Sequence, residues 1–126
     1  MRITRVEPIV LRLPDVDTSR ADGTQDAFLV RVHTDDGLVG VGEADTSPYL
    51  ARTAVEMPSS HAVARGLGEL LLGEDPRATG RLWRLLVGGS SYYGRSGVAL
   101  HAISALDMAL WDLAGQAAGV PVSTLL

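Results

Sequence analysis

The sequence contains no cysteine and no lysine. The absence of cysteine excludes disulfides, thiolate metal sites and cysteine nucleophiles, and it is compatible with a reducing compartment. All eleven basic residues are arginines, spread from Arg2 to Arg95 without a cluster, and the formal net charge is −4. We therefore expect no basic stripe and no nucleic-acid partner.

Long apolar segments are also missing. The N-terminal stretch MRITRVEPIV has no apolar core of the kind found in signal peptides, and no run approaches the ~18 apolar residues that suggest a membrane span. We expect a cytoplasmic protein with no membrane partner. The 46% hydrophobic and 21% charged residues are typical of a globular protein, and 126 residues suffice for one small domain.

The first third of the sequence predicts a three-stranded meander. Residues 3–13 are rich in Ile, Val and Leu, with Pro8 typical of an edge strand or a bulge. Residues 27–44, AFLVRVHTDDGLVGVGEA, predict a β-hairpin that turns at Asp36 and Gly37. Between these strands lies a polar stretch of thirteen residues, 14–26, a length that is usually functional or disordered in compact domains.

From Ser47 onward the pattern predicts about four helices. Ser47-Pro48 indicates a start and Met57-Pro58 a stop, and Ser60 is expected to cap a second helix that runs to about Gly73. Asp75-Pro76 predicts the start of a third helix. The fourth is expected from about residue 98 to 118, with Gly119 at its C-cap. Strands followed by helices favour an α+β fold with helices on one face of an antiparallel sheet.

The fourth helix is apolar on more than one side. Its expected core half consists of Ala99, Ala102, Ile103, Leu106, Ala109, Leu110, Leu113, Ala114 and Ala117. The other half carries no Lys, Arg or Glu, although a solvated face of this length normally has them. We expect that half to meet a second surface through Ser104, Asp107, Met108, Trp111 and Asp112. The alternative is a central helix buried by its own domain.

Residues 102–121, A-x-S-A-L-D-M-A-L-W-D-L-A-G-x-x-x-G-V-P, resemble the signature of the mandelate racemase and muconate lactonizing enzyme family of the enolase superfamily. The resemblance extends to DDGLVGVGEA, LLLGEDP and YYGRSGVALHAISALD. Gln116 departs from the Lys or Arg that the family usually has after this glycine. The resemblance implies a capping domain over residues 1–118, with residues 119–126 starting a linker to a TIM barrel that is absent from this chain.

In this family the barrel carries the Lys or His acid/base residues and three carboxylate ligands for Mg²⁺. The resemblance therefore implies no catalytic residue, no metal ligand and no cofactor in this chain, while the complete enzyme needs Mg²⁺. The implied parent reaction is proton abstraction next to a carboxylate, and acid-sugar dehydration is our choice over racemisation, epimerisation or cycloisomerisation. The implied partner is the C-terminal barrel, and we also expect a homo-oligomer.

The candidate substrate-specificity loops are the polar stretch 14–26 and the segment EADTSPYL at 43–50, after the third strand, because the resemblance implies that they close over the barrel mouth. Their residues able to hold a carboxylate or hydroxyl group are Arg20, Thr24, Gln25, Thr46, Ser47 and Tyr49. A third segment, GSSYYGRS at 89–96, is expected to lie under the barrel and contributes Tyr92, Tyr93 and Arg95.

Two other functions compete with the capping role. GSSYYGRS matches a phosphate-binding loop except that Arg95 replaces Lys, but such a loop follows a strand, and a helix is expected before it here. The other alternative is a non-catalytic module, either a free-standing lid or a domain that self-associates through its fourth helix. A metal site is not expected, since the three histidines fall on different elements without ligand spacing.

Overall fold

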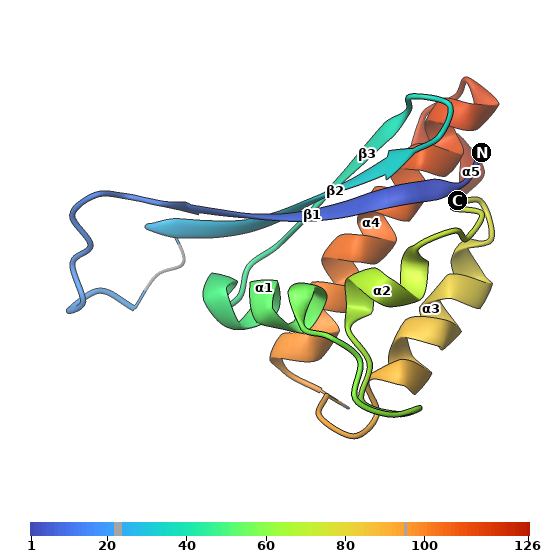
Figure 1. The fold of residues 1–126 in the computed structure, drawn as a ribbon. Coiled ribbons are helices and arrows are strands. Elements are labelled where there is room, and N and C mark those ends of the chain that lie inside the picture. Colours follow the sequence, from blue (N-terminus) through green and yellow to red (C-terminus); the bar gives the residue numbers. More distant parts are fainter. Residues whose placement is uncertain (22–23, 95) are drawn as a thin grey trace.

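The computed structural model describes residues 1–21, 24–94 and 96–126. Three antiparallel strands form one sheet in the order β1-β2-β3: β1 (Ile3–Arg12), β2 (Asp26–Thr34) and β3 (Val39–Ala44). Helices in the described ranges are α1 (Pro48–Glu56), α2 (Leu67–Leu71), α3 (Thr79–Gly89), α4 (Val98–Ala118) and the short α5 (Val122–Leu125). Helices α1 to α4 lie on one side of the sheet (Figure 1). This confirms the predicted α+β meander.

The sheet has the predicted hairpin and edge strand. Strand β2 pairs with β3 around a turn in which Gly37 has φ +88°, a conformation that glycine adopts without strain. Strand β1 lies at the edge, where Pro8 is tolerated because its missing N–H removes no bond from a central ladder. The register of β1 against β2 shifts between Ile3 and Arg5.

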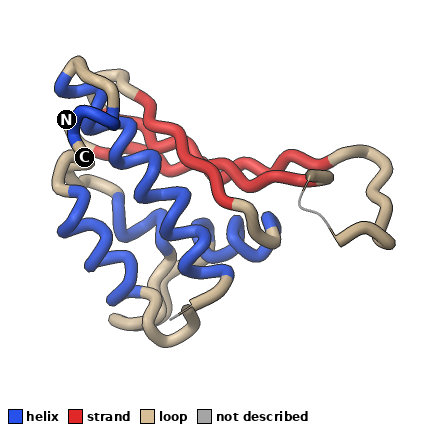
Figure 2. The backbone as a smooth tube through the Cα atoms, turned by 180° about the vertical axis from the view of Figure 1, so that it is seen from behind, coloured by secondary structure: helices blue, strands red, loops and turns tan. Residues whose placement is uncertain are grey.

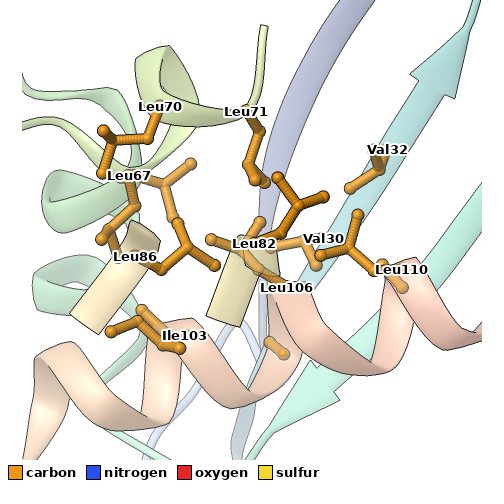
Figure 3. Packing of buried hydrophobic residues seen from close by; sticks show 14 of the residues in the cluster. Val30, Val32, Leu67, Leu70, Leu71, Leu82, Leu86, Ile103, Leu106 and Leu110 are labelled. Carbon is orange, nitrogen blue, oxygen red and sulfur yellow. The ribbon is translucent and has the colours of Figure 1, made fainter. Parts of the chain in front are cut away.

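The core lies between the sheet and the helices (Figure 3). The inward side chains of β2, Phe28, Val30 and Val32, are fully buried, as their alternation predicts. They meet leucines and an isoleucine from three helices. Those fully buried or nearly so are Leu67, Leu71, Leu82, Leu86, Ile103, Leu106 and Leu110.

Two glycines of β3 allow α4 to lie directly on the sheet. A Cβ atom on Gly40 would lie 2.1 Å from the carbonyl oxygen of Ala109, and one on Gly42 would lie 1.8 Å from that of Ala105. Alternate residues of a strand are ~6.7 Å apart, and a helix rises ~6 Å over four residues. The spacing of Gly40 and Gly42 along β3 therefore nearly equals the spacing of Ala109 and Ala105 along α4. The Gly-x-Gly of β3 therefore matches the Ala-x-x-x-Ala of α4.

Helix α4 has the predicted bounds, and Gly119 is its left-handed C-cap with φ 68°. Its buried face follows most of the expected half, except that Ala105 and Gly115 are also buried, Ala114 is only partly buried and Ala117 is exposed. The helix is long and apolar enough to cross a membrane by length and composition. Its contacts with β3 and β2 show instead the core helix of a packed domain. After α4, α5 adds a short fifth helix within the segment expected to start a linker.

The second and third helices are shorter than predicted. Ser60 does not cap α2, which begins at Leu67, because the segment before it bonds to the end of α3: Arg65 N–H donates to the Gly89 carbonyl, at 2.8 Å. Asp75 does not cap α3 either. Its carboxylate accepts hydrogen bonds from the backbone and guanidinium of Arg77 instead. The N-cap residue is Ala78, and the helix starts at Thr79.

Candidate functional site

The two predicted specificity segments leave the same end of the sheet. Strand β1 ends at Arg12 and β2 begins at Asp26, while Ala44, the last residue of β3, pairs with Phe28. The β1–β2 connection extends well beyond the helical layer, and both views show this projection (Figures 1 and 2). The β3–α1 connection is short and lies close to the helices.

Gln25 organises the β1–β2 connection from within. Its side chain is buried, its Oε1 accepts a hydrogen bond from the Asp17 N–H at 2.7 Å, and its Nε2 donates to the Asp17 carbonyl at 3.0 Å. Asp17 in turn accepts bonds from the backbone and hydroxyl of Ser19, which lower the pKa of its carboxyl. Arg20 and Thr24 are exposed on the same connection. Ligand contact by these residues stays a prediction.

The β3–α1 connection places the other three candidates near the start of α4. The Oγ1 of Thr46 lies 3.0 Å from Nδ1 of His101, which belongs to the first turn of α4. Ser47 is the N-cap residue of α1 but forms no side-chain cap bond, and Tyr49 is 54% exposed. The structure thus places Thr46 against His101, with Ser47 and Tyr49 following on the same connection and the first turn of α1.

The loop after α3 has a structural task. The Tyr93 hydroxyl donates to the Arg65 carbonyl at 2.7 Å, and partial burial raises the pKa of Tyr93. Tyr92 is 75% exposed and meets His61 edge to face. Arg95 lies outside the described residues. Because this loop follows helix α3 rather than a strand, the phosphate-loop interpretation has no structural support.

Trp111 lines two hollows beside α4. One has a volume of about 480 Å³ and is lined by Val41, Asp107, Met108, Trp111, Val122 and Leu126. The other, of about 450 Å³, is lined by Arg77, Thr79, Trp111, Ala114, Ala117, Ala118 and Leu125. Met108 is 53% exposed, and the Ser104 hydroxyl donates back to the Leu100 carbonyl at 2.9 Å. We name the residues of both hollows the Trp111 face.

Asp107 is the carboxylate of the Trp111 face. Burial raises the pKa of Asp107, and a hydrogen bond with Trp111 opposes that rise in part. The ionised carboxylate is therefore less favourable in the folded chain than in the unfolded chain. The protonated Asp107 side chain contributes to the stability of the folded chain. That contribution is complete at a pH below the unfolded pKa and is lost as the pH rises through the higher folded pKa.

We accordingly expect Asp107→Asn to raise the melting temperature of the purified chain at pH 7. The gain should shrink as the pH falls and vanish below about pH 3, where the aspartate is protonated in both states. Asp36→Asn is the matched control with the opposite sign, because the hydrogen bond from Thr34 lowers the pKa of Asp36. Thermal scans from pH 2.5 to 7 test this, and equal shifts for both variants at every pH would contradict it.

Asp112 and Gln116 satisfy the outer edge of β3. The N–H of Val41 donates to Oδ2 of Asp112 at 2.9 Å, and Nε2 of Gln116 donates to the Val39 carbonyl at 2.9 Å. Strand β3 is an edge strand, whose outward backbone groups would otherwise be open to pairing. Asp112 thus serves the domain itself, and its contact with a second surface stays a prediction. Gln116 likewise has a structural role in the domain.

We expect Asp112→Ala to lower the free energy of unfolding by about 1 kcal/mol, because it removes a charged acceptor from a backbone N–H at the sheet edge. Asp112→Asn keeps an acceptor oxygen and should cost less than half as much. Urea denaturation of both variants measures the difference. An alanine variant as stable as the asparagine variant would rule out the bond as a stabilising contact.

The described residues contain no group of three or more His, Asp or Glu side chains that could hold a metal ion.

His101 was considered from the sequence only as a metal ligand, and its contact with Thr46 was not predicted. The two residues are 55 positions apart, and no local pattern indicates their contact.

Comparison with known proteins confirms the family resemblance. The family model described as mandelate racemase / muconate lactonizing enzyme, N-terminal domain, matches residues 1–126. A D-galactonate dehydratase family member of Catenulispora acidiphila is 41% identical over 128 residues, which cover 100% of this chain and 26% of that protein.

Solved structures show the same likeness. The crystal structure of a predicted mandelate racemase from Rhodobacter sphaeroides is 35% identical with a TM-score of 0.87, over 98% of this chain and 31% of that one. The 3,6-anhydro-D-galactonate cycloisomerase from Zobellia galactanivorans is 30% identical with a TM-score of 0.79, over 99% of this chain and 31% of that one. The chain thus spans about a quarter to a third of the length of these relatives.

Proposed function

Because this chain belongs to the mandelate racemase / muconate lactonizing enzyme family, as its N-terminal domain, we propose that it is the substrate-gating capping domain of such an enzyme. The proposed parent reaction is Mg²⁺-assisted removal of the proton beside a carboxylate, followed by dehydration of an acid sugar. The observation that carries this proposal is the match of the whole chain to that family domain. The 41% identical relative, named for D-galactonate dehydratase, supports the choice of dehydration.

The partner of this domain in the proposal is the C-terminal barrel of the complete enzyme. The relatives are three to four times longer than this chain, which supports a further domain. Val122, Leu125 and Leu126 line the Trp111 face, so a chain that continues past them starts beside this apolar surface. We propose that the barrel covers the Trp111 face, which would otherwise leave Met108 and part of Trp111 in water.

The chemical step belongs to the rest of the enzyme in this proposal. The residues of this chain do not fit a Mg²⁺ site, since no cluster of three ligands occurs in the described ranges, and the sequence has no lysine to act as base. The tasks left to this domain are to exclude water and to select the substrate through its two polar connections. Arg20 supplies a guanidinium suited to a substrate carboxylate, and Thr46, Ser47 and Tyr49 supply hydroxyl groups.

The experiment is a turnover assay of the complete protein on acid sugars, beginning with D-galactonate and galactarate, with and without Mg²⁺. We expect Mg²⁺-dependent turnover of one acid sugar and none by residues 1–126 alone. Arg20→Ala should lower kcat/KM about tenfold or more, as expected for loss of a charge-assisted bond of about 1.5–3 kcal/mol. Arg84→Ala, on the exposed side of α3, is the matched control and should change nothing. Turnover by the isolated chain, or equal effects of both arginine variants, would contradict the proposal.

The Trp111 face also favours a second candidate function, a module that associates with another copy of itself. Exposed apolar surface costs about 25 cal/mol per Å², and an isologous dimer hides such a face most simply. Sedimentation of the isolated chain with Trp111→Glu as the comparison tests it. A concentration-dependent dimer that the variant abolishes would support self-association; a monomer at all concentrations would leave the capping role.

A further inference from the structure

We propose that His101 is a positioning residue for the β3–α1 connection, holding Thr46, Ser47 and Tyr49 in the arrangement that selects the substrate. This inference rests on the proposed function, because it assigns a task to α4 in the gating that the capping domain performs. It makes one residue of the core helix part of the specificity machinery.

The contact joins a short connection to a rigid element. Nδ1 of His101 lies 3.0 Å from Oγ1 of Thr46, and the backbone N–H of His101 donates to the Gly97 carbonyl at 3.0 Å in the first turn of α4. Helix α4 is anchored along its length by buried residues, so its first turn provides a fixed point. The connection that it holds consists of three residues, 45–47, between the end of β3 and the start of α1.

The connection needs this support because its own cap is weak. Ser47 stands at the N-cap of α1 without a side-chain bond to the helix, although such a bond is the usual anchor of a helix start. Tyr49 is exposed in the first turn. The half-buried Thr46, which lies between β3 and these two residues, is the point where a side chain from α4 reaches the connection.

The chemistry of the pair makes the hold independent of the charge on the imidazole. A threonine hydroxyl both donates and accepts, so it can donate to a neutral Nδ1 or accept from a protonated Nδ1. The support that we assign to His101 therefore requires no proton transfer. Its loss should loosen the binding of substrate, which raises KM, and should leave kcat nearly unchanged.

The test uses the complete protein and the acid sugar that it turns over. His101→Ala is expected to raise KM by about 2- to 10-fold, the range for one net hydrogen bond, with kcat within about twofold of wild type. His101→Asn is the rescue variant, because its amide places a donor or acceptor at the position of Nδ1, and it should keep KM near the wild-type value. The double variant His101→Ala/Thr46→Val should match Thr46→Val alone, since without the hydroxyl the histidine has nothing to hold.

His33→Ala provides the matched control. It removes a histidine contact of the same 3.0 Å length, with Glu7, at the other end of β2, and it should leave KM unchanged. Hydrogen exchange at the amides of residues 45, 46, 47 and 49 is the second readout. Exchange there should be faster in His101→Ala and unchanged in His101→Asn and His33→Ala.

Each outcome decides between the two proposals. If the wild-type protein turns over no acid sugar, the proposed function fails, and exchange at residues 45–49 still determines whether His101 holds the connection. If turnover is normal but His101→Ala changes neither KM nor exchange, the positioning role is wrong and the proposed function stands. An asparagine variant as impaired as the alanine variant would also overturn the role.

Discussion

Replacing Gly42 with alanine is expected to destabilise the folded chain by about 3 kcal/mol or more, at or beyond the upper end of ordinary overpacking. The new methyl group would lie 1.8 Å from the Ala105 carbonyl oxygen and 2.9 Å from its carbonyl carbon, both backbone atoms that cannot rotate away. Relief requires α4 to move off β3, which would also strain the bonds of Asp112 and Gln116 to that strand. Chemical denaturation with circular dichroism measures the loss.

Gly88→Ala is the control for that variant. Gly88 lies in α3, and a Cβ atom there meets nothing within 4 Å. Since alanine reduces the freedom of the unfolded chain and favours helix, this variant should be neutral or about 0.4–1 kcal/mol more stable. A Gly42→Ala protein as stable as Gly88→Ala would show that α4 does not lie against β3 at this distance.

Leu106→Ala is expected to lower the free energy of unfolding by about 2–5 kcal/mol. The Leu106 side chain is fully buried in the middle of α4, among the residues of β2 and α3 in Figure 3. Alanine would leave a cavity there, and the surrounding leucines would lose packing contacts. Because the free energy of unfolding of such domains is only about 5–15 kcal/mol, this single substitution is expected to remove a large part of it.

The comparison for Leu106 lies two residues along the same helix. Met108→Ala truncates a side chain that is 53% exposed, so it should cost less than about 1 kcal/mol in the isolated chain. Both variants introduce alanine into α4, so the difference between their urea midpoints reports the loss of the buried side chain and not a change in helix propensity. Equal losses would mean that α4 is not oriented with Leu106 inward.

The sheet and helix α4 were predictable because their signals are local. Alternating Phe28, Val30 and Val32 with a glycine turn predicts a hairpin with one buried face, and the structure confirms it. The apolar period and Gly119 gave the bounds of α4. The starts of α2 and α3 were wrong since Ser60 and Asp75 are good caps in isolation, but their neighbourhoods bond elsewhere.

The candidate site was predictable only as a set of segments. The polarity of residues 14–26 and the composition of the β3–α1 connection identify where a substrate could be met. They do not reveal that Gln25 turns inward to Asp17, that Asp112 bonds to β3, or that Thr46 meets His101. Each of these bonds uses a polar side chain that, from the sequence alone, could equally contact a substrate or a second surface.

By itself, then, the sequence determined the hairpin with its turn at Asp36 and Gly37 and the apolar excess of α4, because each depends on a pattern among neighbouring residues, and it determined the fold class and the family from the order of such patterns along the chain. Only the tertiary structure decided which polar side chains serve the domain itself and which remain exposed. The reason is physical: packing brings α4 onto β3 through Gly40 and Gly42, and that approach alone puts Asp112 and Gln116 within hydrogen-bond distance of an edge strand over seventy residues earlier.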